Sequence, residues 1–204
     1  MLGLGEALFL EEHYGAAAEM FEVVLARPAP SLLPPGAQTL GPAAPSPVPN
    51  GASRERVFDW WATALDREAQ TRFLIDRDVL YARILDAVRT ELAREPGSVA
   101  AAYWLSAASR AVGDLDRAWD AAIAGWVRSM LAGPAGAALR SDLDRLVLQA
   151  IIPERVRLLA EGDLDRERLA GEMRAAWDAI KRDWKRAQTP GGDEGCARAA
   201  SRDH

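Results

Sequence analysis

The chain has 204 residues and a mass of 22.1 kDa, which is enough for one ordinary domain with a small appendage. Apolar residues make up 49% and charged residues 27% of it, which is globular rather than disordered composition. The net charge of -5 argues against a nucleic-acid binder, because such proteins usually carry a basic surplus. The single cysteine, Cys196, excludes an internal disulfide, and the two histidines leave little material for a histidine metal site.

About one residue in five is alanine, whereas only 7% are aromatic. Alanine favours helix because it loses no side-chain entropy there, so the composition predicts an all-α fold and disfavours a β-sandwich or barrel. No window reaches the roughly 18 uninterrupted apolar residues that a membrane span needs, and the first residues lack the basic segment of a signal peptide. We expect the cytoplasm by default, or the periplasm if the natural start lies upstream of Met1.

Residues 1–27 predict a helical hairpin with a break near residues 13–15. The apolar residues of its second helix recur at steps of three and four, which places them on one face: Ala17, Met20, Phe21, Val24 and Leu25. Residues 28–53 differ in kind, because they hold eight of the 12 prolines. Proline removes a backbone donor and fixes φ, so we expect a Pro-rich linker or surface loop. The alternative is a proline-motif ligand for another domain.

After Ser53, a candidate N-cap, helical periodicity resumes. We expect helices at 54–70, 77–95, 98–112, 115–131, 137–150, 153–161 and 165–187. Together, residues 54–187 predict a helical repeat domain that ends in a capping helix. Residues 188–204 are small and polar, which predicts a disordered tail.

Two segments share the spacing of a helix-hairpin repeat. In the first, Leu4 and Gly5 are followed by two more residues of the pattern. Ala17 comes twelve residues after Gly5, and Phe21 comes sixteen residues after it. A small residue such as Gly5 lets two helices approach, and a large one such as Phe21 fills the gap beside them.

In the second segment, Trp104 lies on the first helix, Gly113 lies in the turn, and Ala118 follows on the second helix. These spacings resemble the tetratricopeptide repeat over residues 2–27 and 78–130. The resemblance implies an array of antiparallel helix hairpins, a tetratricopeptide-like solenoid. The pattern is incomplete, since Ser106 stands where glycine is expected and residues 28–53 interrupt the array. A generic helical-hairpin array with the same packing logic is the alternative.

Motifs for catalysis or cofactors are not recognisable in the sequence. The segment Gly3-Leu4-Gly5 lacks the third small residue and the preceding strand of a dinucleotide loop, and Glu11-Glu12-His13 has the wrong spacing for a zinc-binding helix. Aspartates two residues apart on a helix point to different faces, so we expect them to cap helices rather than to share a proton. We therefore expect no catalytic residue, no cofactor and no metal.

The resemblance implies a non-catalytic protein–protein interaction scaffold, whose first helices line a groove for a peptide or a partner helix. Trp60 and Trp61 point about 100° apart on a helix, so both are buried only if that helix packs on two sides. We take these two and Trp104 as tentative partner contacts. The alternatives are a C-terminal fragment of a longer exported repeat protein, and an enzyme that uses cleft carboxylates with perturbed pKa values.

Overall fold

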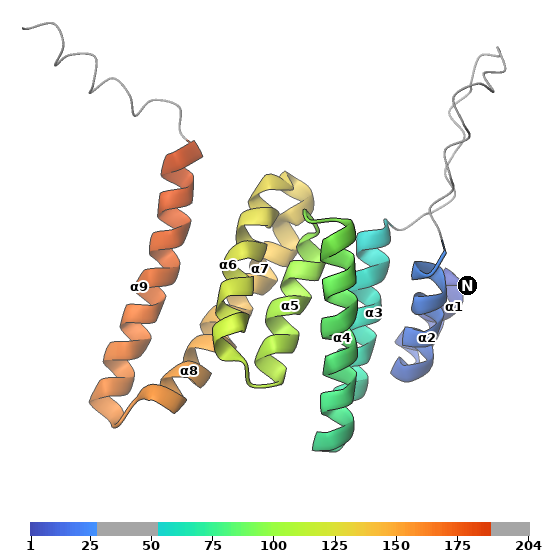
Figure 1. Ribbon diagram of the computed structural model, residues 1–204, viewed down its shortest axis with the longest axis horizontal. Coiled ribbons are helices and arrows are strands. Elements are labelled where there is room, and N and C mark those ends of the chain that lie inside the picture. Colours follow the sequence, from blue (N-terminus) through green and yellow to red (C-terminus); the bar gives the residue numbers. More distant parts are fainter. Residues whose placement is uncertain (28–52, 189–204) are drawn as a thin grey trace, which may run out of the picture. The chain divides into compact units, whose positions relative to one another are not determined.

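The computed structural model describes residues 1–27 and 53–188, and these residues form helices and no strand (Figure 1). The predicted all-α class is confirmed for this part of the chain. The predicted linker at 28–53 and the predicted tail at 188–204 lie outside the described residues except for Ser53, the N-cap of the third helix, and Gln188, the last residue of the final helix. The helices are α1 (Leu2–Leu10), α2 (Tyr14–Leu25), α3 (Arg54–Gln70), α4 (Leu74–Arg94), α5 (Val99–Ala111), α6 (Leu115–Leu131), η1 (Gly133–Gly136), α7 (Ala137–Leu146), η2 (Val147–Ile151), α8 (Ile152–Leu159) and α9 (Asp163–Gln188).

The chain divides into two compact units, Met1–Leu143 and Asp144–His204. The sequence predicted a helical hairpin at residues 1–27 and a helical repeat domain at 54–187, with the Pro-rich segment between them. The first hairpin belongs to the larger unit because α2 packs directly on α3. The boundary of the compact units falls within α7.

Within the first unit, each helix from α1 to α6 packs on the next one in the chain, and α3 also contacts α5 (Figure 1). The large core side chains include Phe21, Trp61, Leu65, Ile84, Val88 and Trp104. Buried alanines lie between them, such as Ala62, Ala100 and Ala108. The high alanine content thus has a second role besides favouring helix, because these small side chains let the helices approach closely.

Three helices begin at side-chain caps, one of which, Ser53, is the N-cap that the sequence predicted. Each cap oxygen accepts a hydrogen bond from the backbone N–H three residues later, which satisfies a donor left free at the start of a helix. The pairs are Ser53 with Arg56 (3.3 Å), Ser98 with Ala101 (3.1 Å), and Asp114 with Arg117 (3.1 Å). Gly113, which precedes the last of these caps, has a φ of 85° that favours glycine.

The close approach predicted at Gly5 is present. A Cβ atom there would lie 2.7 Å from Cε1 of Phe21, a distance that side chains do not tolerate. Phe21 and Ala17 are fully buried beside it. Leu4 was expected to pack in the repeat as well, but 55% of it is exposed. Neighbouring positions on a helix point about 100° apart, so seating Gly5 under Phe21 turns Leu4 toward solvent.

Ser106, which replaces the glycine of the repeat pattern, is buried with its hydrogen bond satisfied. Its hydroxyl donates to the carbonyl oxygen of Ala118 at 2.7 Å, which links α5 to α6. Ala118 is itself fully buried. The departure from the pattern therefore retains a small residue and adds a hydrogen bond between the two helices.

The two helices predicted at 137–150 and 153–161 form one helical run, in which the π-helical turn η2 separates α7 from α8. Pro153 explains this difference. A proline inside a helix lacks the N–H for the bond to the residue four positions before it, and its ring crowds that carbonyl. The wider turn directly before Pro153 accommodates the ring without breaking the helix.

A carboxylate of α3 caps the start of α5. The Oε1 atom of Glu55 accepts hydrogen bonds from the backbone N–H groups of Val99 (2.6 Å) and Ala100 (3.0 Å). The negative charge also complements the positive end of the α5 dipole. Glu55 therefore fixes the position of α5 relative to α3.

We predict that Glu55→Ala lowers the free energy of unfolding by about 1–2 kcal/mol, because two helix N–H groups lose their acceptor. Urea denaturation followed by circular dichroism measures this change. The control is Arg67→Ala, which alters an exposed side chain of the same helix. Equal stabilities of the two variants would show that the Glu55 contact contributes nothing to the fold.

Candidate functional site

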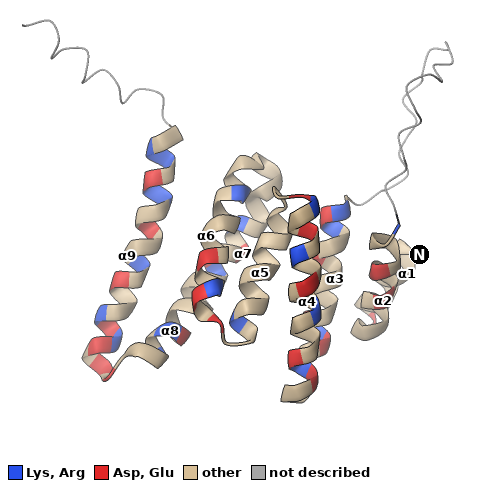
Figure 2. Ribbon diagram, in the orientation of Figure 1, with Lys and Arg blue, Asp and Glu red and all other residues tan. Residues whose placement is uncertain are grey.

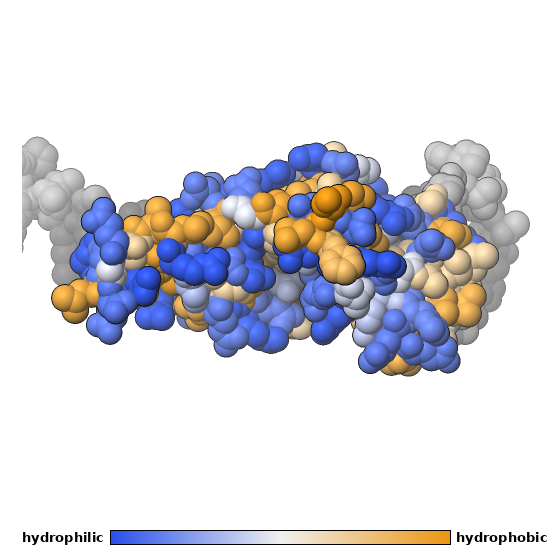
Figure 3. Space-filling model, turned by 90° about the horizontal axis from the view of Figure 1, so that it is seen from below, coloured by the Kyte–Doolittle hydropathy of each residue, from blue (hydrophilic) through white to orange (hydrophobic). Residues whose placement is uncertain are grey.

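The start of α4 exposes a group of large apolar side chains. Phe73, Leu74, Ile75 and Val79 are 89%, 67%, 81% and 64% exposed, and we call these four residues the apolar tip. Figure 3 shows the molecule from below the view of Figure 1. The end of α4 that points down in Figure 1 faces the viewer there, and an apolar patch lies at that place. Contiguous exposed apolar residues of this kind mark interaction surfaces in globular proteins.

The turn between α3 and α4 places these side chains in solvent. Thr71 supports the turn, since its hydroxyl donates to the carbonyl oxygen of Glu68 at 2.7 Å. Phe73 then holds the N-cap position of α4, with φ -67° and ψ 159°, and its side chain makes no capping bond. Burial of a large apolar side chain stabilises a protein or a complex by about 1.5–3 kcal/mol. The side chains of the apolar tip do not contribute this free energy to folding, because they are exposed.

A groove of about 460 Å³ adjoins the apolar tip. We call it the acidic groove; its lining residues are Gly15, Glu19, Leu65, Glu68, Arg72, Asp76, Val79, Leu80 and Arg83. Val79 belongs to both the tip and the groove, so the two form one continuous surface. The first turns of α4 carry acidic residues directly after the apolar start (Figure 2).

The acidic groove has a net negative charge, and its arginines are already paired. Arg72 pairs with Glu68, and Arg83 pairs with Glu22 outside the groove. Glu19 and Asp76 form no ion pair with any residue that the structure describes. The acidic groove therefore holds two carboxylates without a counter-ion among the described residues, beside an apolar surface.

The three tryptophans predicted as partner contacts lie away from this surface. Trp61 and Trp104 are buried in the core of the first unit, so neither indole presents a surface to a partner in this conformation. Trp60 is half-buried, with its ring 5.8 Å from that of Phe21 and the guanidinium of Arg56 4.6 Å above it. Only Trp60 therefore retains an accessible part.

The exposure of the apolar tip was not predicted from the sequence. The predicted helix begins at residue 77, whereas α4 begins at Leu74. The prediction therefore assigned Phe73 to Ile75 to the preceding turn. Three consecutive large apolar residues in a turn are unusual, and this run was the available indication of a contact surface.

An enzyme that uses cleft carboxylates would require a carboxylate with a perturbed pKa, and Asp59 has one. Burial raises its pKa above the ordinary value, the hydrogen bond from Trp104 opposes this shift, and the nearby Asp142 and Glu55 add to it. However, Asp59 accepts a hydrogen bond from Nε1 of Trp104 at 2.8 Å, and Glu55 is occupied by the N-terminus of α5. Both carboxylates thus bind α5, and neither lines the acidic groove.

Neither a cluster of metal ligands nor a membrane-spanning helix is found in the described ranges 1–27 and 53–188. Within them, no three His, Cys, Asp or Glu side chains are grouped so as to hold a metal ion. None of the helices described is both long enough and apolar enough to cross a bilayer.

No family model, no curated protein and no solved structure matches this chain.

We predict that Asp59→Asn becomes more stable relative to the wild type as the pH rises from about 4 to 7. The pKa of Asp59 is raised in the folded state, so the unfolded chain releases this proton more readily, and ionisation lowers the stability of the wild type over that range. Asparagine retains an oxygen that accepts from Trp104 but carries no charge. Urea denaturation at three pH values tests this, with the exposed Asp78→Asn as control; a difference from wild type that does not vary with pH would contradict it.

Proposed function

We propose that this chain is a non-catalytic protein–protein interaction module of the tetratricopeptide-repeat type. Its partner is a basic, amphipathic protein segment that binds the apolar tip and the acidic groove together. The observation that carries the proposal is the exposure of Phe73, Leu74 and Ile75 directly beside the acidic groove. Two carboxylates of this groove have no counter-ion among the described residues.

The packing of the first unit supports the repeat type. Consecutive helices pack in order along the chain, and α3 also contacts α5, as first helices of neighbouring hairpins do in a stacked array. Two contacts match the spacing of the repeat, Gly5 under Phe21 and Ser106 against Ala118. In this arrangement, α1, α3 and α5 are first helices, and α2, α4 and α6 are second helices.

The charge and shape of the surface specify the partner. Large apolar side chains of the partner cover the apolar tip and recover the burial free energy that the fold leaves unused. Lysine or arginine side chains beside them reach Glu19 and Asp76, which have no counter-ion among the described residues. The groove takes its residues from α2, α3 and α4 rather than from first helices alone, so the partner lies against the outer end of the α3–α4 hairpin.

Selection of peptides from a random phage-displayed library on the immobilised protein tests this proposal. We expect one class of selected peptides to carry at least two large apolar residues and a net positive charge. An enriched peptide, labelled with fluorescein, is then titrated against wild type and variants by fluorescence polarisation.

We predict that Phe73→Ser/Ile75→Ser weakens binding of this peptide at least about 10-fold, because interface energy concentrates in buried apolar anchors. Leu131→Ser removes another exposed apolar side chain of the same unit and should leave the affinity unchanged. Asp76→Asn should weaken binding and reduce its salt dependence. Selection of no basic apolar peptide, or equal affinity of such a peptide for the double variant and the wild type, would contradict the proposal.

A further inference from the structure

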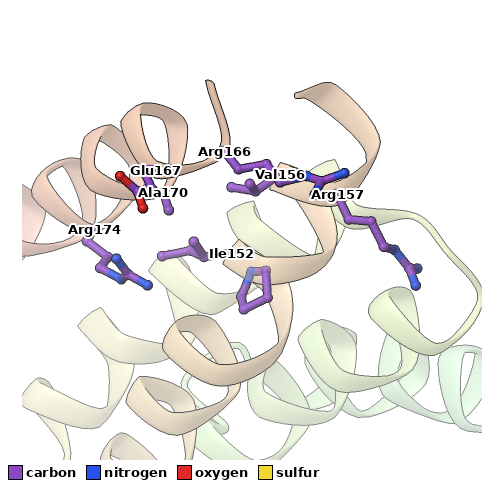
Figure 4. A pocket seen from close by; sticks show the side chains of 8 residues that line it. Ile152, Val156, Arg157, Arg166, Glu167, Ala170 and Arg174 are labelled. Carbon is purple, nitrogen blue, oxygen red and sulfur yellow. The ribbon is translucent and has the colours of Figure 1, made fainter. Parts of the chain in front are cut away.

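The second compact unit contains a groove between α8 and α9 (Figure 4). Its volume is about 600 Å³, and all of its lining residues belong to the unit that begins at Asp144. We call it the arginine groove; it is lined by Ile152, Pro153, Val156, Arg157, Arg166, Glu167, Ala170 and Arg174.

The floor of the arginine groove is apolar. Ile152 and Val156 lie four residues apart on α8, hence on one face of the helix, and both are buried. Ala170 faces them from α9, as the close view shows (Figure 4). Because alanine is short, it leaves room above the floor for an apolar side chain from outside the chain.

The rim of the arginine groove is cationic. Arg166 and Arg174 lie four residues before and after Ala170 on α9, so they are about 12 Å apart along the helix axis. Arg166 pairs with Asp163 at 2.8 Å, whereas Arg157 and Arg174 form no ion pair with a described residue. Glu167 is the one acidic residue among those that line the groove.

We infer that the arginine groove docks an acidic amphipathic helix of a partner protein. In this helix, an apolar side chain lies between two carboxylates that are eight residues apart, which matches the spacing of Arg166, Ala170 and Arg174. Guanidinium groups bind carboxylates through paired N–H donors, and the space above the half-buried Ala170 takes an apolar side chain, which a free inorganic anion does not have. This site prefers a charge opposite to that of the acidic groove, so it is independent of the function proposed above.

The test uses a fluorescein-labelled helical peptide of about 16 residues, with two glutamates eight residues apart and leucines along the stripe between them. We expect it to bind the full chain, with an affinity that falls as salt rises. The same peptide with glutamine in place of glutamate should bind at least about 10-fold more weakly, since it lacks the charge that the arginines recognise.

Variants locate the peptide on the chain. Arg174→Gln should weaken binding at least about 10-fold, whereas Arg182→Gln, another exposed arginine of α9, should leave it unchanged. Ala170→Gln fills the groove floor and should weaken binding without removing a charge. The tip variant Phe73→Ser/Ile75→Ser should retain full affinity, which separates this site from the acidic groove.

Three results would overturn the inference. One is the absence of binding to the wild type at peptide concentrations up to about 1 mM, the weak end of measurable affinities. The second is equal binding of the glutamate and glutamine peptides. The third is an Arg174→Gln variant, shown by circular dichroism to be folded, that binds as tightly as the wild type.

Discussion

The carboxylates of α3 join this helix to three of its neighbours in the first unit. This helix packs against α2, α4 and α5, and its acidic residues bind each of these neighbours. The contacts are Glu55 to the start of α5, Asp59 to the indole of Trp104 on α5, Asp66 to the hydroxyl of Tyr81 on α4 (2.8 Å), and Glu68 to the backbone N–H of Gly15 on α2 (3.2 Å). Charge on α3 therefore serves the architecture of the array.

The carboxylates that bind neighbouring helices differ from those of the surface proposed for partner binding. Burial of Tyr81 and its hydrogen bond to Asp66 raise the pKa of the phenol, so it stays neutral and donates to that carboxylate. Carboxylates that bind neighbouring helices in this way are not free to bind substrate. The apolar tip, Glu19 and Asp76 take no part in these contacts, and the two carboxylates form no ion pair within the described part of the chain, which is why we propose this surface for partner binding.

Local interactions made much of the fold predictable. The caps Ser53 and Ser98 bind backbone groups within one turn, so the sequence alone places the starts of α3 and α5 to within one residue. The approach at Gly5 was predictable because the repeat spacing ties it to Phe21. The contact of Glu55 with Val99 was not predictable, because it joins two helices that only the packed structure brings together. Exposure of Phe73 was missed for the same reason, since periodicity shows which residues are apolar but not which lack a neighbour.

Native-state hydrogen exchange of the first unit tests the central role of α3 most directly. The account predicts that core amides of α3 and α5, such as those of Leu65 and Ala108, exchange with one common free energy equal to that of global unfolding. Amides of α1, which contacts α2 at the end of the array, should exchange with a lower free energy. Exchange of α3 at a lower free energy than α5 would contradict the account, because α3 would then open without disrupting the helices that its carboxylates bind.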